Sequence, residues 1–238
     1  MLFWVLYLAH ITGDFPLQTD TVYKIKMRSS WGVIPHVVIC SIANIVFLYP
    51  LWGHLNTWAA ILLLGLIHTF LDKTKIVLSS RTSNDSLFNF LLDQVLHLFS
   101  ILLVAFWLDH VLEQQHVATM IRFYNKNVLV ISSALLLASF AGVPFTYYTK
   151  KYWMRRISGL STAMSYPRYK DRFSGMVERT LATAGLVLGS WWLFLSVLIF
   201  LPRILASCHT EKKAEIIIEQ VCGFFVSLLC GAIVLLFA

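Results

Sequence analysis

The sequence predicts an all-helical membrane protein, a polytopic bundle of about seven transmembrane helices. Three observations support this fold class. Hydrophobic residues make up 58% of the 238 residues and charged residues only 13%, and the mean hydropathy is +0.72. The apolar residues gather in long runs, and the basic residues lie mainly between those runs. Such a composition is typical of membrane proteins and leaves no length for a large separate soluble domain.

Seven runs are long enough to cross a bilayer, which requires about 20 mostly apolar residues. They are residues 1–18, 32–52, 57–78, 87–108, 128–148, 182–206 and 215–237. In the first run we expect Pro16 to end the regular hydrogen bonding, because proline has no N–H and disfavours helix at the residue before it. Residues 1–108 hold the first four runs. Residues 109–238 add an outer loop, three further spans and a basic connection to the same membrane domain.

The basic residues determine the predicted orientation. Most of the 19 Lys and Arg residues fall in three connections that lie on one side of a seven-span topology. These residues are Lys24, Lys26, Arg28, Lys73, Lys75, Arg81, Lys150, Lys151, Arg155, Arg156, Arg168, Lys170, Arg172 and Arg179. By the positive-inside rule that side is the cytoplasm, so we expect the amino terminus outside and the carboxyl terminus in the cytoplasm. The net charge of +7 then matches anionic lipid headgroups, and we expect no nucleic-acid partner.

Three of the apolar runs each contain a His and an Asp four residues apart. The pairs are His10 with Asp14, His68 with Asp72, and Asp93 with His97. Four residues along a helix correspond to about 40° of rotation, so both side chains of a pair share one face. The run with the third pair crosses the membrane in the opposite direction and carries its two residues in reverse order. Packing of these helices is therefore expected to place three carboxylates in one layer and three imidazoles in a second layer about 6 Å away.

One interpretation of this cluster is a metal site. Ionisable residues inside a membrane span cost a few kcal/mol each and by default mark function. Together with His36, which the topology places in the same cytoplasmic half, the three pairs offer ligands for one or two divalent Zn, Mn or Fe ions. Such ions activate water for hydrolysis, with Asp14, Asp72 and Asp93 as candidate catalytic residues. The protein would then be a membrane-embedded, metal-dependent hydrolase acting on a lipid-linked or amphiphilic substrate.

Two other interpretations remain open. Asp and His side chains inside membranes also form proton relays and cation sites, which would make the protein a proton- or ion-coupled transporter. A relay should continue beyond the midplane of the membrane, and Glu215 with Glu219 in the last run is the candidate continuation. Alternatively, each pair is a hydrogen bond or ion pair that joins helices without chemistry, and the protein has a structural role.

Five further residues are candidates for supporting roles. They are Gln18, Lys75, Gln94, Glu178 and Arg179. The two glutamines can orient ligands or satisfy backbone groups, and Lys75 can pair with Asp72, contact a phosphate or extend to the headgroups. The adjacent Glu and Arg either close over the cluster from the cytoplasm or form an ordinary interfacial ion pair.

The four cysteines show no Cys-x-x-Cys spacing and are interpreted as small buried residues. They are Cys40, Cys208, Cys222 and Cys230.

Several of these residues together resemble a known family. The pattern is His10-xxx-Asp14-Phe-x-Leu-Gln18, then His36, then His68-xxx-Asp72-xx-Lys75, then Asp93-Gln94-xx-His97, with Gly175-Met-Val-Glu-Arg179 further on. It is similar to the bacterial membrane family called domain of unknown function 3307, closely over the first four apolar runs and loosely over the rest. The resemblance implies a multi-pass protein of the bacterial cytoplasmic (inner) membrane, and the family name implies no activity.

Overall fold

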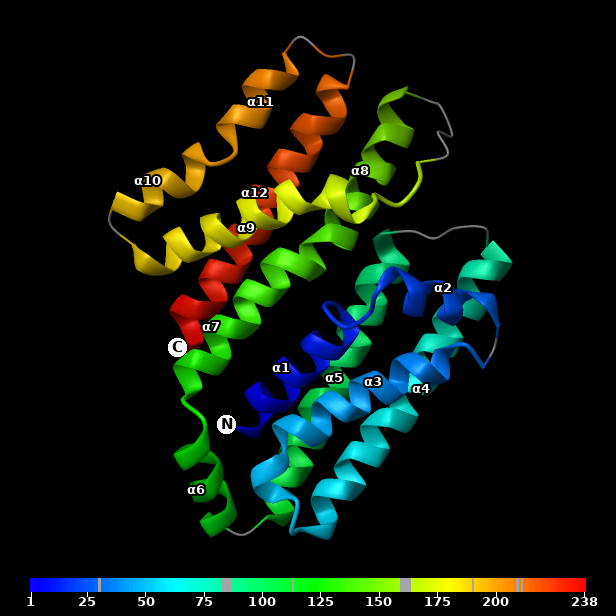
Figure 1. The fold of residues 1–238 in the computed structure, drawn as a ribbon, viewed down its shortest axis with the longest axis vertical. Coiled ribbons are helices and arrows are strands. Elements are labelled where there is room, and N and C mark those ends of the chain that lie inside the picture. The colour runs from blue at the N-terminus through cyan, green and yellow to red at the C-terminus, as the bar shows by residue number, and fades with distance from the viewer. Residues whose placement is uncertain are drawn as a thin grey trace. The chain divides into compact units, whose positions relative to one another are not determined.

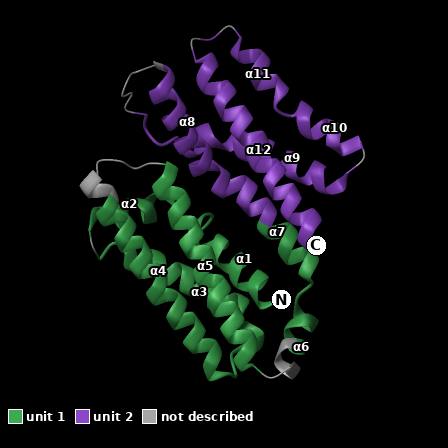
Figure 2. Ribbon diagram, turned by 180° about the vertical axis from the view of Figure 1, so that it is seen from behind, with its two compact units in different colours: residues 1–133 green, residues 134–238 purple. Residues whose placement is uncertain are grey.

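The computed structural model describes residues 1–29, 31–82, 87–112, 114–158, 164–189, 191–208, 210 and 212–238, without the side chains of residues 79–82, 114–117 and 158. This part of the chain is helical and contains no strand (Figure 1), which confirms the all-helical prediction. The chain divides into two compact units, Met1–Ser133 and Ala134–Ala238 (Figure 2). Each unit is described by itself. The side chain of Arg81, counted above among the basic residues, lies outside the described part.

The first unit is built around four mutually packed helices. Its elements are α1 (Leu2–Asp14), α2 (Asp20–Arg28), α3 (Val33–Phe47), the 3-10 turn η1 (Tyr49–Leu51), α4 (Leu55–Thr82), α5 (Leu87–Val111) and α6 (Gln114–Phe123), followed by the start of α7 (Lys126–Leu136). Helix α1 packs on α3 and α5, α3 packs on α4, and α4 packs on α5, so the four helices close a ring, with α2 against α3. This ring encloses every His-Asp pair predicted from the sequence.

Helix α1 is an inner helix, shorter than the predicted span. Ten of its 13 residues are buried, as expected for a helix that is apolar on all sides. The last helical hydrogen bond joins the Phe15 N–H to the Ile11 carbonyl at 3.1 Å, directly before Pro16. At 1.5 Å per residue α1 is about 20 Å long, less than the roughly 30 Å hydrocarbon core of a bilayer.

The segment between the first two predicted spans forms a short helix, α2, that the sequence analysis treated as a connection. The Thr19 hydroxyl accepts a hydrogen bond from the Val22 N–H at 3.4 Å, and Asp20 in the first turn and Arg28 in the last turn complement the helix dipole. In α2 the one buried residue is Lys26. An amphipathic helix normally buries its apolar side chains, so α2 is unusual in turning a lysine towards the core.

The second unit begins within one long helix. Helix α7, the π-helical segment η2 (Leu137–Ala141) and α8 (Gly142–Ser158) follow one another without a break, and residues 128–148, the predicted fifth span, lie inside this 32-residue helix. The unit also contains α9 (Tyr169–Leu188), α10 (Trp191–Leu198), α11 (Leu201–Ser207) and α12 (Lys213–Phe237). Helix α12 packs on α8, α9 and α11, and α9 packs on α10 and η2.

Residues 182–206, predicted as the sixth span, do not form one continuous helix. In this respect the prediction was wrong. Helix α9 ends where Gly189 adopts a φ of +67°, a left-handed conformation that glycine takes without a steric penalty. The chain then reverses and α10 packs against α9. Apolar composition predicted the membrane character of this stretch, but the glycine ended the helix inside it.

Among the described residues, three helices are long and apolar enough to cross a membrane: Leu87–Val111, Lys126–Ile157 and Lys213–Phe237. Shorter apolar helices cover Val33–Phe47 and Trp191–Ser207. Large apolar side chains also face outwards, including Phe70, Phe88 and Phe106, which are 68%, 70% and 76% exposed. These features indicate a membrane protein, because a soluble protein seldom combines helices of this length and hydropathy with so many exposed large apolar side chains. The count of seven spans and the orientation of the termini stay predictions.

Gly13, where α1 packs closely against α3, is a position where we expect added side-chain volume to lower the stability of the protein. A Cβ atom added at Gly13 would lie 2.8 Å from the Cys40 Cα and 2.9 Å from its Sγ, so Gly13→Ala should force the two helices apart. We expect a loss of about 1–3 kcal/mol of stability, the usual cost of overpacking, measured as a lower midpoint of thermal unfolding in detergent. Gly53→Ala is the matched control, since a Cβ there meets nothing within 4 Å. Equal midpoints for the two variants would contradict the close packing.

Candidate metal centre

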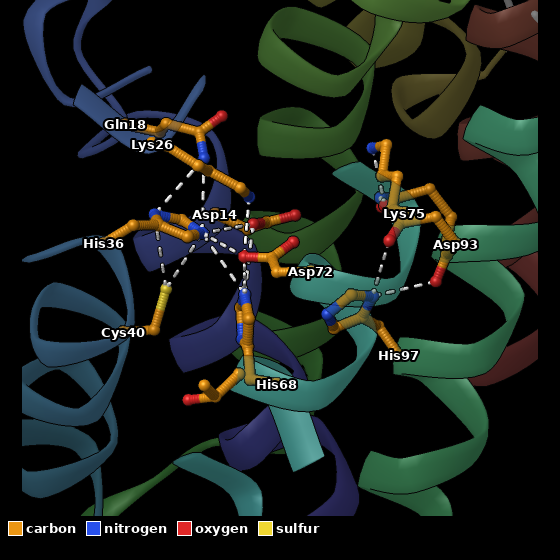
Figure 3. A network of polar contacts seen from close by, with 12 residues as sticks. Asp14, Gln18, Lys26, His36, Cys40, His68, Asp72, Lys75, Asp93 and His97 are labelled. Carbon is orange, nitrogen blue, oxygen red and sulfur yellow. Dashed lines mark hydrogen bonds and ion pairs between the residues drawn. The ribbon is translucent and has the colours of Figure 1, made fainter. Parts of the chain in front are cut away.

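Four helices of the first unit bring the predicted site residues together (Figure 3). Helix α1 supplies His10 and Asp14, α3 supplies His36, α4 supplies His68 and Asp72, and α5 supplies Asp93 and His97. All seven side chains are buried. Because each His-Asp pair occupies one face of its helix, closing the four-helix ring points all of them at its interior.

The imidazole rings form one continuous layer. The centroid of the His68 ring lies 4.5 Å from that of His97, 5.3 Å from that of His10 and 5.0 Å from that of His36. The rings of His10 and His97 are stacked at 5.1 Å. The spacing and reversed order in the sequence predicted this layer for three of the rings, and His36 extends it.

Four residues place one donor atom each within 4.8 Å of all the others: Asp14, His36, Cys40 and His68. The Nε2 atom of His36 lies 3.0 Å from Asp14 Oδ1 and 3.2 Å from His68 Nε2. The same Asp14 oxygen is 3.7 Å from His68 Nε2, and Cys40 Sγ is 3.8 Å from His36 Nε2. A carboxylate, two imidazoles and a thiol at these separations could hold a metal ion.

The Nε2 atom of His36 has more polar neighbours than it can satisfy by hydrogen bonding. The neighbours are Asp14 Oδ1 at 3.0 Å, Gln18 Nε2 at 3.2 Å, His68 Nε2 at 3.2 Å and Asp72 Oδ2 at 3.6 Å. A neutral ring nitrogen either donates one hydrogen or accepts one. The Gln18 amide can supply a hydrogen while the carboxylates require one, so these contacts cannot all be hydrogen bonds. A cation bound between these groups would attract both carboxylates and the lone pair of the ring at the same time.

A second donor group consists of His68, Asp72 and His97. The Nδ1–H of His97 donates to the Asp93 backbone carbonyl at 2.8 Å, which leaves the lone pair on Nε2, as is common for metal-binding histidines. Within the described structure this buried Nε2 has no hydrogen-bond partner, and the same holds for His10 Nε2. Both rings line a cavity of about 10 Å³, the size of about one water molecule.

The carboxylate layer predicted from the sequence forms only in part. Asp14 and Asp72 both approach His36 and His68, but Asp93 belongs to neither donor group. Its Oδ2 accepts from Lys75 Nζ at 2.9 Å and from Gln94 Nε2 at 3.0 Å. Lys75 therefore pairs with Asp93, where the sequence analysis considered Asp72 or the headgroups, and Gln94 supports Asp93 rather than a metal ligand.

Two residues of the cluster were missed in the sequence analysis. Lys26 of α2 lies 2.6 Å from Asp72 Oδ2 through its Nζ, and Cys40, interpreted only as a small buried residue, lies among the donors. The spacing His36-xxx-Cys40 repeats that of the His-Asp pairs and was a usable signal. Lys26 had none, because nothing in its neighbourhood in the sequence separates it from Lys24 and Arg28.

Glu178 and Arg179 lie in the second unit and form contacts within it. Glu178 accepts from Arg203 and Gln220, while Arg179 donates to backbone carbonyls of η2. Through these contacts the two residues link α9 to α11, α12 and η2. The prediction that they close over the His/Asp cluster gains no support from them.

A family model described as "Protein of unknown function (DUF3307)" matches residues 2–135, more than half of the 238 residues. The chain belongs to this family. The match confirms the family resemblance and contains every residue of both donor groups. No curated protein and no solved structure matches the chain, so for this member of DUF3307 the function has to be argued from the site.

The ion pair between Lys26 and Asp72 predicts a large stability effect. Lys26→Met leaves the Asp72 carboxylate, which is 1% exposed, without its cation. Removing one partner of a buried pair typically costs about 3–5 kcal/mol, so we expect a clear drop in the midpoint of thermal unfolding. Lys24→Met, on the exposed face of the same helix, is the control. The double variant Lys26→Met/Asp72→Asn should recover much of the loss in the unfolding midpoint. If the losses of the two single variants instead add up in the double variant, the two side chains do not interact.

Proposed function

We propose that the first unit binds one divalent transition-metal ion between Asp14, His36, Cys40 and His68. The observation that carries this proposal is the set of donor distances. Metal bonds of 2.0–2.3 Å in tetrahedral geometry require donors about 3.3–3.8 Å apart, and the neighbouring donors here are 3.0–3.8 Å apart. The separations of Cys40 from Asp14 and from His68 are bounded at 4.8 Å, so binding an ion requires mainly a movement of the Cys40 thiol.

The donor set favours zinc among the candidate ions. The carboxylate of Asp14 and a thiolate at Cys40 together balance the two positive charges of the ion, which matters in a buried site. A thiolate with two imidazoles suits Zn²⁺, whereas Mn²⁺ prefers oxygen ligands. We therefore expect Zn²⁺, with Fe²⁺ as the next candidate.

One ion per chain is the expected stoichiometry. A second ion would bind to His68, Asp72 and His97, but His68 is common to both donor groups, and Lys26 already provides a positive charge at Asp72. Binding a second divalent ion would bring its charge close to the lysine ammonium. That repulsion favours a single ion.

The reaction we propose is hydrolysis of a lipid-linked or amphiphilic substrate in the bacterial cytoplasmic membrane. Hydrolysis needs a coordination position open to water, so an ion held for catalysis would keep three of the four donors as ligands and leave the fourth position to a water molecule, whose pKa zinc lowers. Asp72 lies beside the proposed ion without belonging to its donor group, 3.3 Å from His68 Nε2 and 3.6 Å from His36 Nε2. Because Lys26 Nζ holds its Oδ2 at 2.6 Å, Asp72 would accept a proton through its other oxygen. In the seven-span topology with the amino terminus outside, this site would lie in the cytoplasmic half of the membrane, where an amphiphile would arrive through the bilayer.

A proton relay is the second candidate, and one specific observation favours it. The rings of His36, His68, His97 and His10 follow one another at 4.5–5.1 Å, and His36 Nε2 lies 3.2 Å from His68 Nε2. Chains of imidazoles and carboxylates conduct protons in membrane transporters. The same side chains serve either function, so metal content and proton flux must be measured separately.

The metal proposal predicts the metal content of a set of variants. Full-length protein purified in detergent should contain about one zinc per chain by inductively coupled plasma mass spectrometry, and removal of the ion with a chelator should lower its thermal stability. His36→Ala should lose the ion because His36 is a ligand of the proposed site. His97→Ala should keep it, and so should the control His54→Ala in the turn before α4. Absence of stoichiometric metal, or equal metal content in His36→Ala and His54→Ala, would refute the proposal.

Reconstitution into vesicles separates hydrolase from transporter. If the cluster is a metal site, vesicles with the protein and a pH gradient should show no more proton flux, by an enclosed pH-sensitive dye, than vesicles without it. A flux that disappears in Asp72→Asn but not in Asp20→Asn, which removes an acidic residue of α2 outside the cluster, would favour the relay instead.

A further inference from the structure

We propose that the second unit binds a phosphate-type oxyanion in a cavity between α8, α9 and α12, separate from the metal centre. The cavity has a volume of about 100 Å³, well above the 10–15 Å³ that one water occupies by the same measure. Its charged lining residues are Lys150, Asp171, Arg172, Arg179 and Glu219. The space is therefore large enough for a small polyatomic ligand and is surrounded by charge.

The charge of the lining favours an anion. Three lining side chains are cationic and two are acidic, and the acidic Glu219 is already paired on both oxygens. Its Oε1 accepts from Arg203 at 2.9 Å and its Oε2 from Lys150 at 3.2 Å. A further cation in the cavity would compete with these side chains. An anion would instead face three cationic side chains, of which Lys150 is already shared with Glu219 and lies 4.0 Å from Glu215 Oε2.

Arg179 is the buried cation of this lining. The side chain is 2% exposed, and among the described residues no carboxylate lies within 4 Å of it; Glu219 and Glu178 act on its charge from farther away. Its Nε donates to the Ala138 carbonyl at 2.7 Å and its Nη2 to the Ser139 carbonyl at 3.0 Å. Both carbonyls belong to the π-helical segment η2, where the wider turn changes the regular hydrogen bonding of the helix. Neutral carbonyls hold the guanidinium in place without cancelling its charge.

The backbone around Arg179 is shaped to admit this side chain. A Cβ added at Gly142 would overlap Arg179 Nε, one at Gly175 would lie 3.1 Å from Nη1, and one at Gly223 would lie 3.6 Å from Cγ. Glycines on α8 and α9 thus leave room for the buried arginine, whereas the distance at Gly223 is ordinary van der Waals contact. Burying an arginine without a carboxylate costs free energy, and such a cost is typical of functional sites rather than of packing.

The cavity also lies beside aromatic side chains that are typical of the headgroup region. Tyr166 and Tyr169 are 40% and 53% exposed, and the Arg172 guanidinium lies over both rings, 5.8 Å and 5.4 Å from their centroids. Trp and Tyr concentrate at the level of the lipid headgroups, and arginine matches the geometry of phosphate oxygens. A phosphate group, of a lipid headgroup or free in solution, is the anion that fits this position.

Ligand-dependent thermal unfolding of the full-length protein in non-ionic detergent tests the proposal. The probes are dioleoylphosphatidylglycerol, dioleoylphosphatidylcholine and inorganic phosphate, and tryptophan fluorescence reports unfolding. Phosphatidylglycerol should raise the midpoint with saturation. Arg172→Gln and Lys150→Gln should weaken the apparent affinity about tenfold or more, since each removes a hydrogen bond to a charged group. Arg156→Gln removes the same charge from the exposed side of α8 and should change the affinity less than twofold.

The outcomes distinguish the source of the phosphate. Stabilisation by phosphatidylglycerol but not by inorganic phosphate identifies a lipid headgroup, and the reverse identifies a soluble phosphate; both support the site if the cavity variants weaken binding and Arg156→Gln does not. The proposal is overturned if neither probe stabilises the protein, if phosphatidylcholine stabilises it equally without any dependence on Lys150 and Arg172, or if Arg156→Gln weakens binding as much as the cavity variants.

Discussion

The buried charge of Asp14 and Asp72 is the constraint on which the first unit depends. A carboxylate removed from water without a partner is too costly to bury, so the four-helix ring can close only if cations or hydrogen-bond donors close with it. His36 and His68 supply part of this compensation. The remainder comes from Lys26, which explains why α2 folds back on α3 with a lysine on its buried side. A metal ion would serve the same purpose more completely.

The same constraint operates with the opposite sign in the second unit. There the buried group is the guanidinium of Arg179, whose direct hydrogen bonds run to two carbonyls of the π-helical segment rather than to carboxylates. Glu178 and Glu219 instead share Arg203, which joins α9 and α12 through α11. Both units therefore carry polar groups whose burial is costly, and neither arrangement is explained by helix packing alone, because apolar side chains would pack as well without the cost.

Asp93 shows how far a helical repeat predicts a site. Its spacing to His97 was sufficient to bring the imidazole of His97 against His68 and His10. The same spacing was insufficient for the carboxylate, because Lys75 lies on the facing helix and pairs with Asp93. Spacing determines which face of a helix a side chain occupies, but the partner across the interface decides where its charged end points.

The sequence by itself determined the all-helical fold, the membrane character and the convergence of three His-Asp pairs, because hydrophobic runs and the helical repeat are local properties of the chain. Pro16 marked the end of α1 for the same reason. Only the tertiary structure decided that Cys40 meets Asp14 and His68 at the donor group, that Lys26 neutralises Asp72 and that Arg179 rests on a π-helical segment. Each of these contacts joins groups on different elements, and such pairings depend on how helices approach one another, which no local pattern encodes.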